Sequence, residues 1–285
     1  MLTPLTDGGE KLDEAVVEPM IDFLLNHGAD GLFILGTTGE GINLGRDERE
    51  RVLRLVHQAL AGRGKLLVHC GAQTTRETVA LAADAAAFGV SAVAVIPPPY
   101  YPLDERELVT HLSAAAAACS PTPFYIYAFS ARSGYPVSVS VVERVRELAP
   151  NLAGLKVSES PFERVAPYLG LGLPVFIGSE PLIAAAAVVG ISGSVSGVAS
   201  VFPDQVRALL DDPTPQRATA MAALREAISR HSLIATAKVI LADRGVPIRP
   251  AVRAPLRQLD QDEAQEARRR VAEVLLRVAL LAPPL

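Results

Sequence analysis

One lysine stands in a stretch that otherwise has the composition of a buried strand, NLAGLKVSES at 151–160. Lys156 is one of four lysines in a chain of 285 residues. Alternate side chains of a strand share a face, so Lys156 would lie with Leu152 and Gly154. Inside a barrel, desolvation favours the neutral amine, which can attack a carbonyl and form an imine. The alternative is a lysine at a strand end that reaches solvent or pairs with Glu159.

A second group of polar residues, GTTGE, follows directly after the apolar run DGLFIL. Gly36 begins this loop, and glycine permits a sharp backbone turn. Thr37 and Thr38 offer hydroxyl and backbone N–H groups, which together can hold a carboxylate. A plain turn that leads into a helix near Arg46 is the alternative interpretation.

Two tyrosine-containing segments could take part in the same chemistry, FYIYAFSARSG at 124–134 and PPPYYP at 97–102. Tyr127, close to a strand end, could exchange a proton with a carbinolamine. Arg132 could bind a carboxylate through two parallel hydrogen bonds. The alternatives are a core tyrosine and an exposed loop arginine, and a packing or oligomer contact for Tyr101 on its stiff, proline-rich loop.

The elements that must position these residues follow a repeated pattern, an apolar helical run, a glycine and a short β-rich run. It occurs at 20–36, 81–97 and 182–197. Further strands are expected at 66–71, 123–129, 152–158 and 174–179, with polar-faced helical segments between them. This alternation predicts a parallel sheet of seven strands from residue 30 onward, and LTPL at 2–5 could supply an eighth. We therefore expect a (β/α)8 TIM barrel over 1–213 and a C-terminal helical region over 214–285, with helices at 203–212, 216–230, 233–243 and 260–281.

Composition excludes several classes of protein. A net charge of −4 and a pI near 5.8 leave no basic surface for nucleic acid. The uncharged stretch 181–202 is long enough for a membrane span, but its Gly/Ser-rich end favours a strand with turns. Cys70 and Cys119 form neither a disulfide framework nor a zinc motif, and no signal peptide is evident, so we expect a cytoplasmic protein. The five histidines form no paired metal motif.

Taken together, these motifs resemble the dihydrodipicolinate synthase and N-acetylneuraminate lyase family of class I, pyruvate-dependent aldolases. The resemblance rests on TPL near the start, GTTGE, PPPYY, a tyrosine followed by ARSG, GLK, and GVPIRPAVRAPL at 245–256. It implies an imine at Lys156, acid/base catalysis by Tyr127, and a proton relay through Thr37 to Tyr101, which in the family typically comes from a neighbouring subunit. For substrate binding it implies the following residues: Gly36, Thr38, Arg132, Ser133 and Gly134.

The resemblance also implies a homotetramer, pyruvate or another 2-oxo acid and an aldehyde as substrates, and no metal or organic cofactor. The chain departs from the family where Asn-x-Pro usually follows the tyrosine, because it has Ala128 and Ser130 there. It also has VSES after the lysine, and only two residues precede Thr3. A dihydrodipicolinate synthase-like condensation is the first expectation. A sugar-acid aldolase or dehydratase, a non-catalytic 2-oxo acid binding barrel and a pyridoxal phosphate enzyme remain as alternatives.

Overall fold

The computed structural model describes residues 1–281, and its centre is a curled sheet of parallel strands. In the described residues this sheet has seven strands, which neighbour one another in chain order. They are β3 (Gly31–Ile34), β4 (Lys65–His69), β5 (Ala92–Val95), β6 (Phe124–Ala128), β7 (Leu152–Val157), β8 (Val175–Ile177) and β9 (Gly193–Ser194). Their carboxyl ends therefore gather at one mouth, where active sites of barrel enzymes lie.

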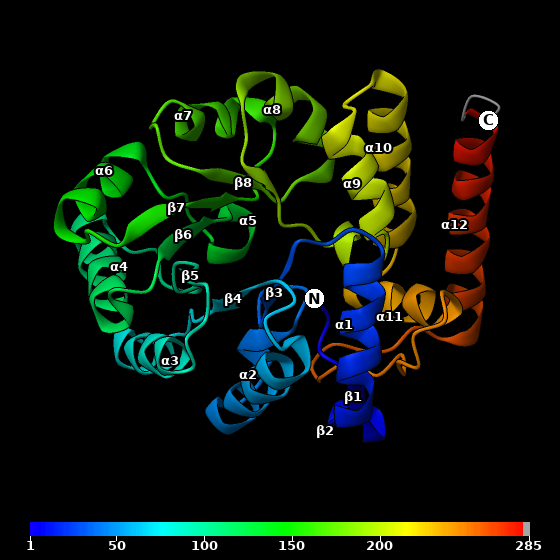
Figure 1. The fold of residues 1–285 in the computed structure, drawn as a ribbon, viewed down its shortest axis with the longest axis horizontal. Helices are drawn as coiled ribbons and strands as arrows, with labels where there is room; N and C mark the ends of the chain where they lie inside the picture. Colours follow the sequence, from blue (N-terminus) through cyan, green and yellow to red (C-terminus); the bar gives the residue numbers. More distant parts are fainter. Residues whose placement is uncertain (282–285) are drawn as a thin grey trace.

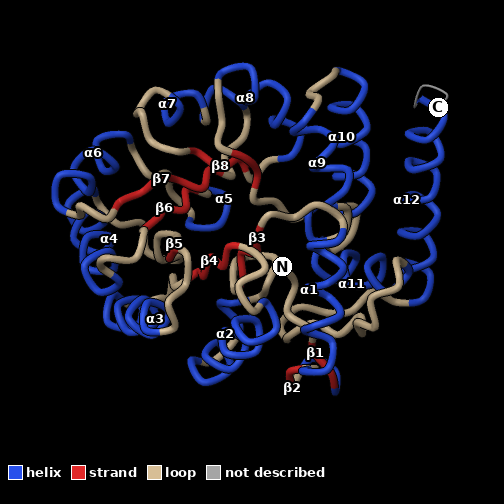
Figure 2. Tube along the Cα trace, in the orientation of Figure 1, coloured by secondary structure: helices blue, strands red, loops and turns tan. Residues whose placement is uncertain are grey.

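Helices surround the outside of this sheet, as Figures 1 and 2 show. They are α1 (Val17–Asn26), α2 (Arg46–Leu60), α3 (Thr75–Ala87), α4 (Glu105–Cys119), α6 (Val139–Leu148), α7 (Ala166–Leu169) and α8 (Ile183–Val189). A four-residue helix, α5 (Ser130–Ser133), follows β6 directly. The predicted alternation of strands and helices, and with it the α/β barrel architecture, is confirmed.

Local sequence signals set where these helices begin and end. The side chains of Thr74 and Ser138 accept hydrogen bonds from backbone N–H groups in the first turns of α3 and α6. Asp104 and Glu107 form a capping box at the start of α4. At the other end, the three glycines of the repeated pattern have the expected left-handed backbone, with φ of 95° at Gly28, 69° at Gly89 and 97° at Gly190.

The expectation that LTPL forms an eighth barrel strand is wrong. Instead β1 (Leu5–Thr6) pairs antiparallel with β2 (Lys11–Leu12) in a separate two-stranded sheet. Pro4 has no N–H group to donate to a strand ladder, which explains why this segment does not join the sheet. Residues 1–4 nevertheless run beside β3, because the amino group of Met1 donates a hydrogen bond to the carbonyl of Phe33 at 2.9 Å.

Four helices follow the last barrel strand: α9 (Pro203–Asp211), α10 (Pro215–Ser229), α11 (Leu233–Asp243) and α12 (Gln261–Leu281). Their bounds agree with the predicted helices to within one residue over the described part. Helix α10 packs against α9, α11 and α12 (Figure 1). The uncharged stretch 181–202 contains α8 and β9, and no helix within residues 1–281 is both long and apolar enough to cross a membrane.

Candidate active site

Lys156 and Tyr127 lie side by side at the carboxyl end of the barrel. They are direct partners in the register of β6 and β7. The Lys156 Nζ atom lies 3.8 Å from the centre of the Tyr127 ring and 4.6 Å from that of Phe33 on β3. Tyr127 is 2% exposed, whereas Lys156 is half-buried. The amine thus stands against two aromatic faces and stays accessible from the mouth of the barrel.

Thr37 completes this group, as the sequence predicted. Its hydroxyl lies 3.2 Å from the Tyr127 hydroxyl, at hydrogen-bonding distance. Since Thr37 follows β3 and Tyr127 lies on β6, residues 90 positions apart meet across the barrel. The structure therefore brings together an amine and two linked hydroxyl groups that can pass a proton.

The loop after β3 has an unusual backbone that fixes the direction of both threonines. Leu35 and Glu40 have positive φ of 60° and 55°. A Cβ atom on Gly36 would lie 2.6 Å from the Phe33 ring, so glycine is required for this close approach. Thr38 faces the end of β9, because a Cβ atom on Gly197 would come within 3.3 Å of its hydroxyl oxygen.

A buried ion pair that the sequence analysis missed anchors the end of this loop. Lys238 on α11 donates hydrogen bonds to Glu40 Oε1 and to the carbonyl of Ala251, both at 2.6 Å. The other carboxylate oxygen of Glu40 accepts a hydrogen bond from the Arg253 backbone N–H at 2.7 Å. Burial lowers the pKa of Lys238, and the nearby Glu40 opposes that shift. The scarcity of lysine in the sequence is a signal that singles out Lys238 as well as Lys156.

Three of the predicted substrate-binding residues, Arg132, Ser133 and Gly134, lie on α5 or directly after it, and their surroundings differ. Arg132 is exposed, and its guanidinium carbon lies 5.7 Å from the centre of the Phe129 ring, which in turn stacks on Tyr127 at 6.1 Å. The buried hydroxyl of Ser133 donates hydrogen bonds to backbone carbonyls, at 2.6 Å to that of Tyr135. Gly134 ends the helix with φ of 90°. Ser133 and Gly134 thus shape the loop, whereas the exposed Arg132 guanidinium lies near the Phe129 ring.

Glu159 holds the start of this short helix. Its buried carboxylate accepts hydrogen bonds from the Ser130 backbone N–H at 2.6 Å and from the Ser130 hydroxyl at 2.5 Å. The alternative in which Glu159 pairs with Lys156 is therefore not what the structure has. Ser130 and Glu159, which are two of the residues that depart from the family pattern, thus contact each other and fix the backbone just beyond Tyr127.

Tyr101 is not brought to Thr37 within this chain. Tyr100 and Tyr101 are 82% and 72% exposed, with their ring centres 4.8 Å apart in an edge-on arrangement. Tyr100 also has a positive φ of 88°, which is unusual for a residue with a bulky side chain. This loop projects a pair of aromatic rings into solvent.

His69 lies at the end of β4, the strand next to β3. Its ring packs against Phe33 and Tyr127, the two aromatic residues beside Lys156. Its ring lies edge-on to Tyr127 at 6.0 Å, and its Nδ1 atom lies 3.0 Å from the Leu35 carbonyl. Burial lowers the pKa of His69 to about 3, and the Arg49 guanidinium contributes to that shift. The ring is thus neutral at ordinary pH, and Nδ1–H donates to the loop that carries Thr37.

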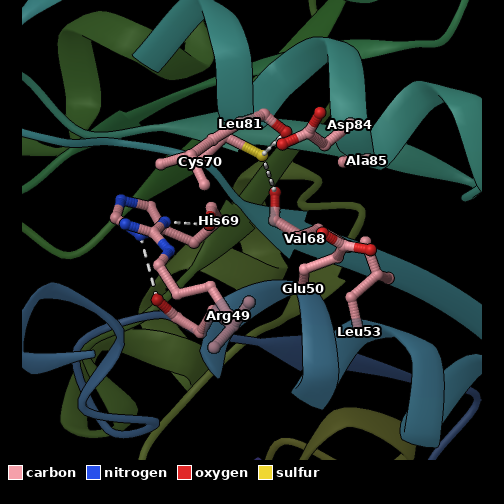
Figure 3. A pocket seen from close by; sticks show the side chains of 10 residues that line it. Arg49, Glu50, Leu53, Val68, His69, Cys70, Leu81, Asp84 and Ala85 are labelled. Carbon is pink, nitrogen blue, oxygen red and sulfur yellow. Dashed lines mark hydrogen bonds between the residues drawn. The ribbon is translucent and has the colours of Figure 1, made fainter. Parts of the chain in front are cut away.

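A small cavity behind His69 is shown in Figure 3. It lies between α2, β4 and α3, and residues from all three elements line it: Arg49, Glu50, Leu53, Val68, His69, Cys70, Leu81, Asp84 and Ala85. Its volume of about 10 Å³ is no more than a single water molecule needs. It therefore cannot hold a substrate.

Comparison with known proteins agrees with this geometry. The model of the "Dihydrodipicolinate synthetase family" matches residues 1–274. An uncharacterized DapA-like lyase of Halobacterium salinarum is 34% identical over 90% of this chain and 86% of its own. The 4-hydroxy-tetrahydrodipicolinate synthase of Mycolicibacterium paratuberculosis is 30% identical over 96% and 94%. The solved structure of the Methylacidiphilum fumariolicum enzyme of that name has a TM-score of 0.90 at 25% identity, over 99% of this chain and 97% of that one. The resemblance drawn from the motifs is thus confirmed, and the chain is an enzyme of the dihydrodipicolinate synthetase family, a family of class I lyases.

Proposed function

We propose that this enzyme binds pyruvate or a closely related 2-oxo acid as an imine at Lys156. The observation that carries the proposal is the group formed by the Lys156 amine, Tyr127 and Thr37. An amine 3.8 Å from the centre of a phenol ring, whose hydroxyl is linked to a second hydroxyl at 3.2 Å, has the parts needed for imine formation. No metal and no organic cofactor take part in the proposed chemistry.

In the proposed reaction, the Lys156 nitrogen attacks the keto carbon of the 2-oxo acid and forms a carbinolamine. Tyr127 donates a proton to the departing hydroxyl group, which leaves as water, and the imine results. Loss of a proton from the adjacent carbon gives an enamine, with the protonated imine nitrogen as the electron sink. Thr38, together with the backbone of its loop, would hold the substrate carboxylate near the end of β9.

The second step is proposed to be a condensation with an aldehyde that carries a carboxylate. The enamine carbon forms the new C–C bond with the aldehyde carbon, and the aldehyde oxygen takes up a proton. Arg132 supports an acidic partner, because its exposed guanidinium lies on the ring that stacks on Tyr127. The M. paratuberculosis relative is a 4-hydroxy-tetrahydrodipicolinate synthase, and its name agrees with this reaction class.

The exposed tyrosine pair supports an assembly of several copies, which we propose to be a cytoplasmic homotetramer. In that assembly, Tyr101 of one subunit would enter the site of another and extend the relay from Thr37. The large aromatic surface at 100–101 would then be buried, which offsets the cost of holding Tyr100 at positive φ.

The test is intact-protein mass spectrometry after incubation with pyruvate and borohydride, followed by peptide mapping. We expect one reduced pyruvyl adduct per chain, at Lys156, and none in Lys156→Ala. Product analysis with an acidic four-carbon aldehyde and with a sugar acid would then separate the condensation from the sugar-acid alternative. A folded wild-type protein that acquires no adduct would refute the imine mechanism.

A further inference from the structure

The Glu40–Lys238 ion pair joins two parts of the chain that the mechanism treats separately. Glu40 closes the loop that carries Thr37 and Thr38, whereas Lys238 comes from the C-terminal helices, 198 residues further along. Both side chains are 0% exposed. Among the described residues, the Glu40 carboxylate is held on one oxygen by Lys238 and on the other by the Arg253 backbone N–H.

Such a pair is not an efficient way to stabilise a fold. Removing two charges from water costs more than most ion pairs regain, and apolar residues of similar volume often serve equally well. A buried, hydrogen-bonded pair instead fixes the relative position of the two segments that it joins, because its directional hydrogen bonds form in only one arrangement. A role in setting the loop conformation therefore explains the pair better than a role in stability alone.

The loop has little freedom apart from this pair. The Thr3 hydroxyl donates a hydrogen bond to the carbonyl of Gly39 at 2.5 Å, next to Glu40. Glu40 itself has a left-handed backbone, with φ of 55°, which costs free energy for a residue other than glycine. A Cβ atom on Gly41 would lie 1.8 Å from the Leu35 carbonyl oxygen, so the loop closes tightly on its own start. Small movements of Glu40 must therefore be passed to the two threonines just before it.

We propose that Lys238 is a positioning residue, which through Glu40 fixes the loop that binds the 2-oxo acid carboxylate and carries the first hydroxyl of the proton relay. Lys238 does not touch the substrate. This inference rests on the proposed function, because it assigns a partner for the same loop. It makes the C-terminal helices part of the active-site architecture.

The experiment measures borohydride trapping of pyruvate as a function of pyruvate concentration, together with thermal unfolding, on the full chain. We expect Lys238→Met to raise the half-saturating pyruvate concentration by about tenfold or more, since a small misplacement of a binding group has effects of that size. At saturating pyruvate the adduct should still form at Lys156. The matched control is Arg244→Met, which removes a cation from the end of the same helix, where its partner is Asp204.

A double variant separates positioning from stability. Glu40→Gln/Lys238→Met has no buried charge, and its amide oxygen can still accept the Arg253 N–H, so it should unfold near the wild-type temperature. A raised half-saturating concentration in that variant supports the proposal, even if Lys238→Met alone does not fold. The proposal would be overturned if the double variant had the half-saturating pyruvate concentration of the wild type. It would also be overturned if that concentration were equal in Lys238→Met and Arg244→Met. Absence of trapping in the wild type would instead remove the proposed function, and this inference with it.

Discussion

At the scale of single residues, the hydroxyl of Tyr127 has the most specific role in the proposed mechanism. Tyr127→Phe keeps the aromatic face beside the Lys156 amine but removes the group that donates and accepts protons. We expect turnover to fall by about 10²–10⁴-fold, the usual contribution of general acid–base catalysis. The half-saturating pyruvate concentration in borohydride trapping should change little. Steady-state kinetics and trapping on the same sample check both parts.

Thr37 provides the matched comparison, because its hydroxyl is the only partner of the Tyr127 hydroxyl in the described residues. If the two groups act as one relay, the turnover of the double variant Thr37→Val/Tyr127→Phe should be only slightly lower than that of the slower single variant. Multiplicative losses of activity would mean that the two hydroxyl groups act independently.

His111 on α4 gives a prediction about stability. Burial lowers its pKa from 6.5 to about 4, and within residues 1–281 its Nε2 atom has no hydrogen-bond partner. The unfolded chain binds a proton at this ring below pH 6.5, whereas the folded chain does so only near pH 4. The free energy of unfolding is therefore unaffected by His111 above pH 6.5, and it decreases as the pH falls toward 4.

His111→Phe should reduce this acid loss by about 2 kcal/mol. At pH 7.5 it should lower the free energy of unfolding by no more than about 1 kcal/mol, because the hydrogen bond between the Thr75 hydroxyl and His111 Nδ1 is lost. Urea unfolding at pH 7.5 and pH 4.5 measures both quantities. An identical pH dependence in variant and wild type would show that His111 is not the responsible group. Buried His69, whose pKa is lowered to about 3, contributes in the same direction and remains in both proteins.

The sequence could predict that Lys156, Tyr127 and Thr37 lie together because strand alternation and motif order are local properties. Lys156 and Tyr127 could be placed on inward faces from a few neighbours each, and Thr37 from its position after a strand. The Glu40–Lys238 pair could not be found in this way, since only the folded chain brings positions 198 residues apart together. The commitment of Ser133 to backbone carbonyls was equally invisible, because a serine in a loop has the same sequence signature whether it faces substrate or backbone.

At the scale of elements, α5 places Arg132 just beyond Tyr127, and its first residue, Ser130, departs from the family pattern. Its first residue is held by the Glu159 carboxylate, and Arg132 follows within the same turn. Arg132→Ala should raise the Michaelis constant for an acidic aldehyde by about tenfold or more and leave that for pyruvate unchanged, because a charge-assisted contact is lost only with the second substrate.

Arg132→Lys tests the geometry of that contact. Lysine keeps the charge but lacks the planar fork, so it should restore only part of the affinity for the aldehyde. If the aldehyde's Michaelis constant is the same in wild type and Arg132→Ala, the contact assigned to Arg132 is wrong. An equal effect on pyruvate would place Arg132 in the first binding step.

The helices and most strands could be predicted because their signals are strong and repeated. Glycine after an apolar helical run correctly marked the ends of α1, α3 and α8. The prediction failed at LTPL, because it relied on the apolar pattern of this segment although Pro4 has no N–H group to donate to a strand ladder. The pairing of Leu5 with Leu12 also requires the tight turn between them, and such a turn is not part of the strand–helix alternation of a barrel.

At the scale of the whole molecule, the C-terminal helices and the barrel depend on each other. Besides Lys238, Arg225 on α10 approaches the buried carboxylate of Glu180, which follows β8, at 3.1 Å. Two buried carboxylates at the barrel mouth thus have cationic partners from beyond residue 213. Separated from those partners, each would be an uncompensated buried charge, which is strongly destabilising. We propose that the division near residue 213 marks a change of architecture and not a boundary between independently folding units.

The exposed Tyr101 leads to a prediction about assembly. Tyr101→Ala and Lys156→Ala should each lack turnover as pure proteins, the first through a broken relay and the second through the missing amine. If Tyr101 acts in a neighbouring subunit, a mixed assembly contains some sites with an intact Lys156 from one chain and an intact Tyr101 from the other. Dissociating the two inactive variants, mixing them and letting them reassemble should therefore restore activity. If chains pair at random into dimers in which each subunit completes its partner's site, the recovered rate should be about a quarter of the wild-type rate.

The proportion follows from counting sites. Random pairing makes half of the dimers mixed, and each mixed dimer has one complete site out of two. The control is a mixture of Lys156→Ala with Lys156→Ala/Tyr101→Ala, which should stay inactive because neither chain supplies the amine. No recovery in a mixture that native mass spectrometry shows to contain hybrids would mean that Tyr101 serves its own subunit or has no role in the relay. Recovery would show that a functional site requires two chains, which accounts for a structure in which a single chain leaves both aromatic rings exposed.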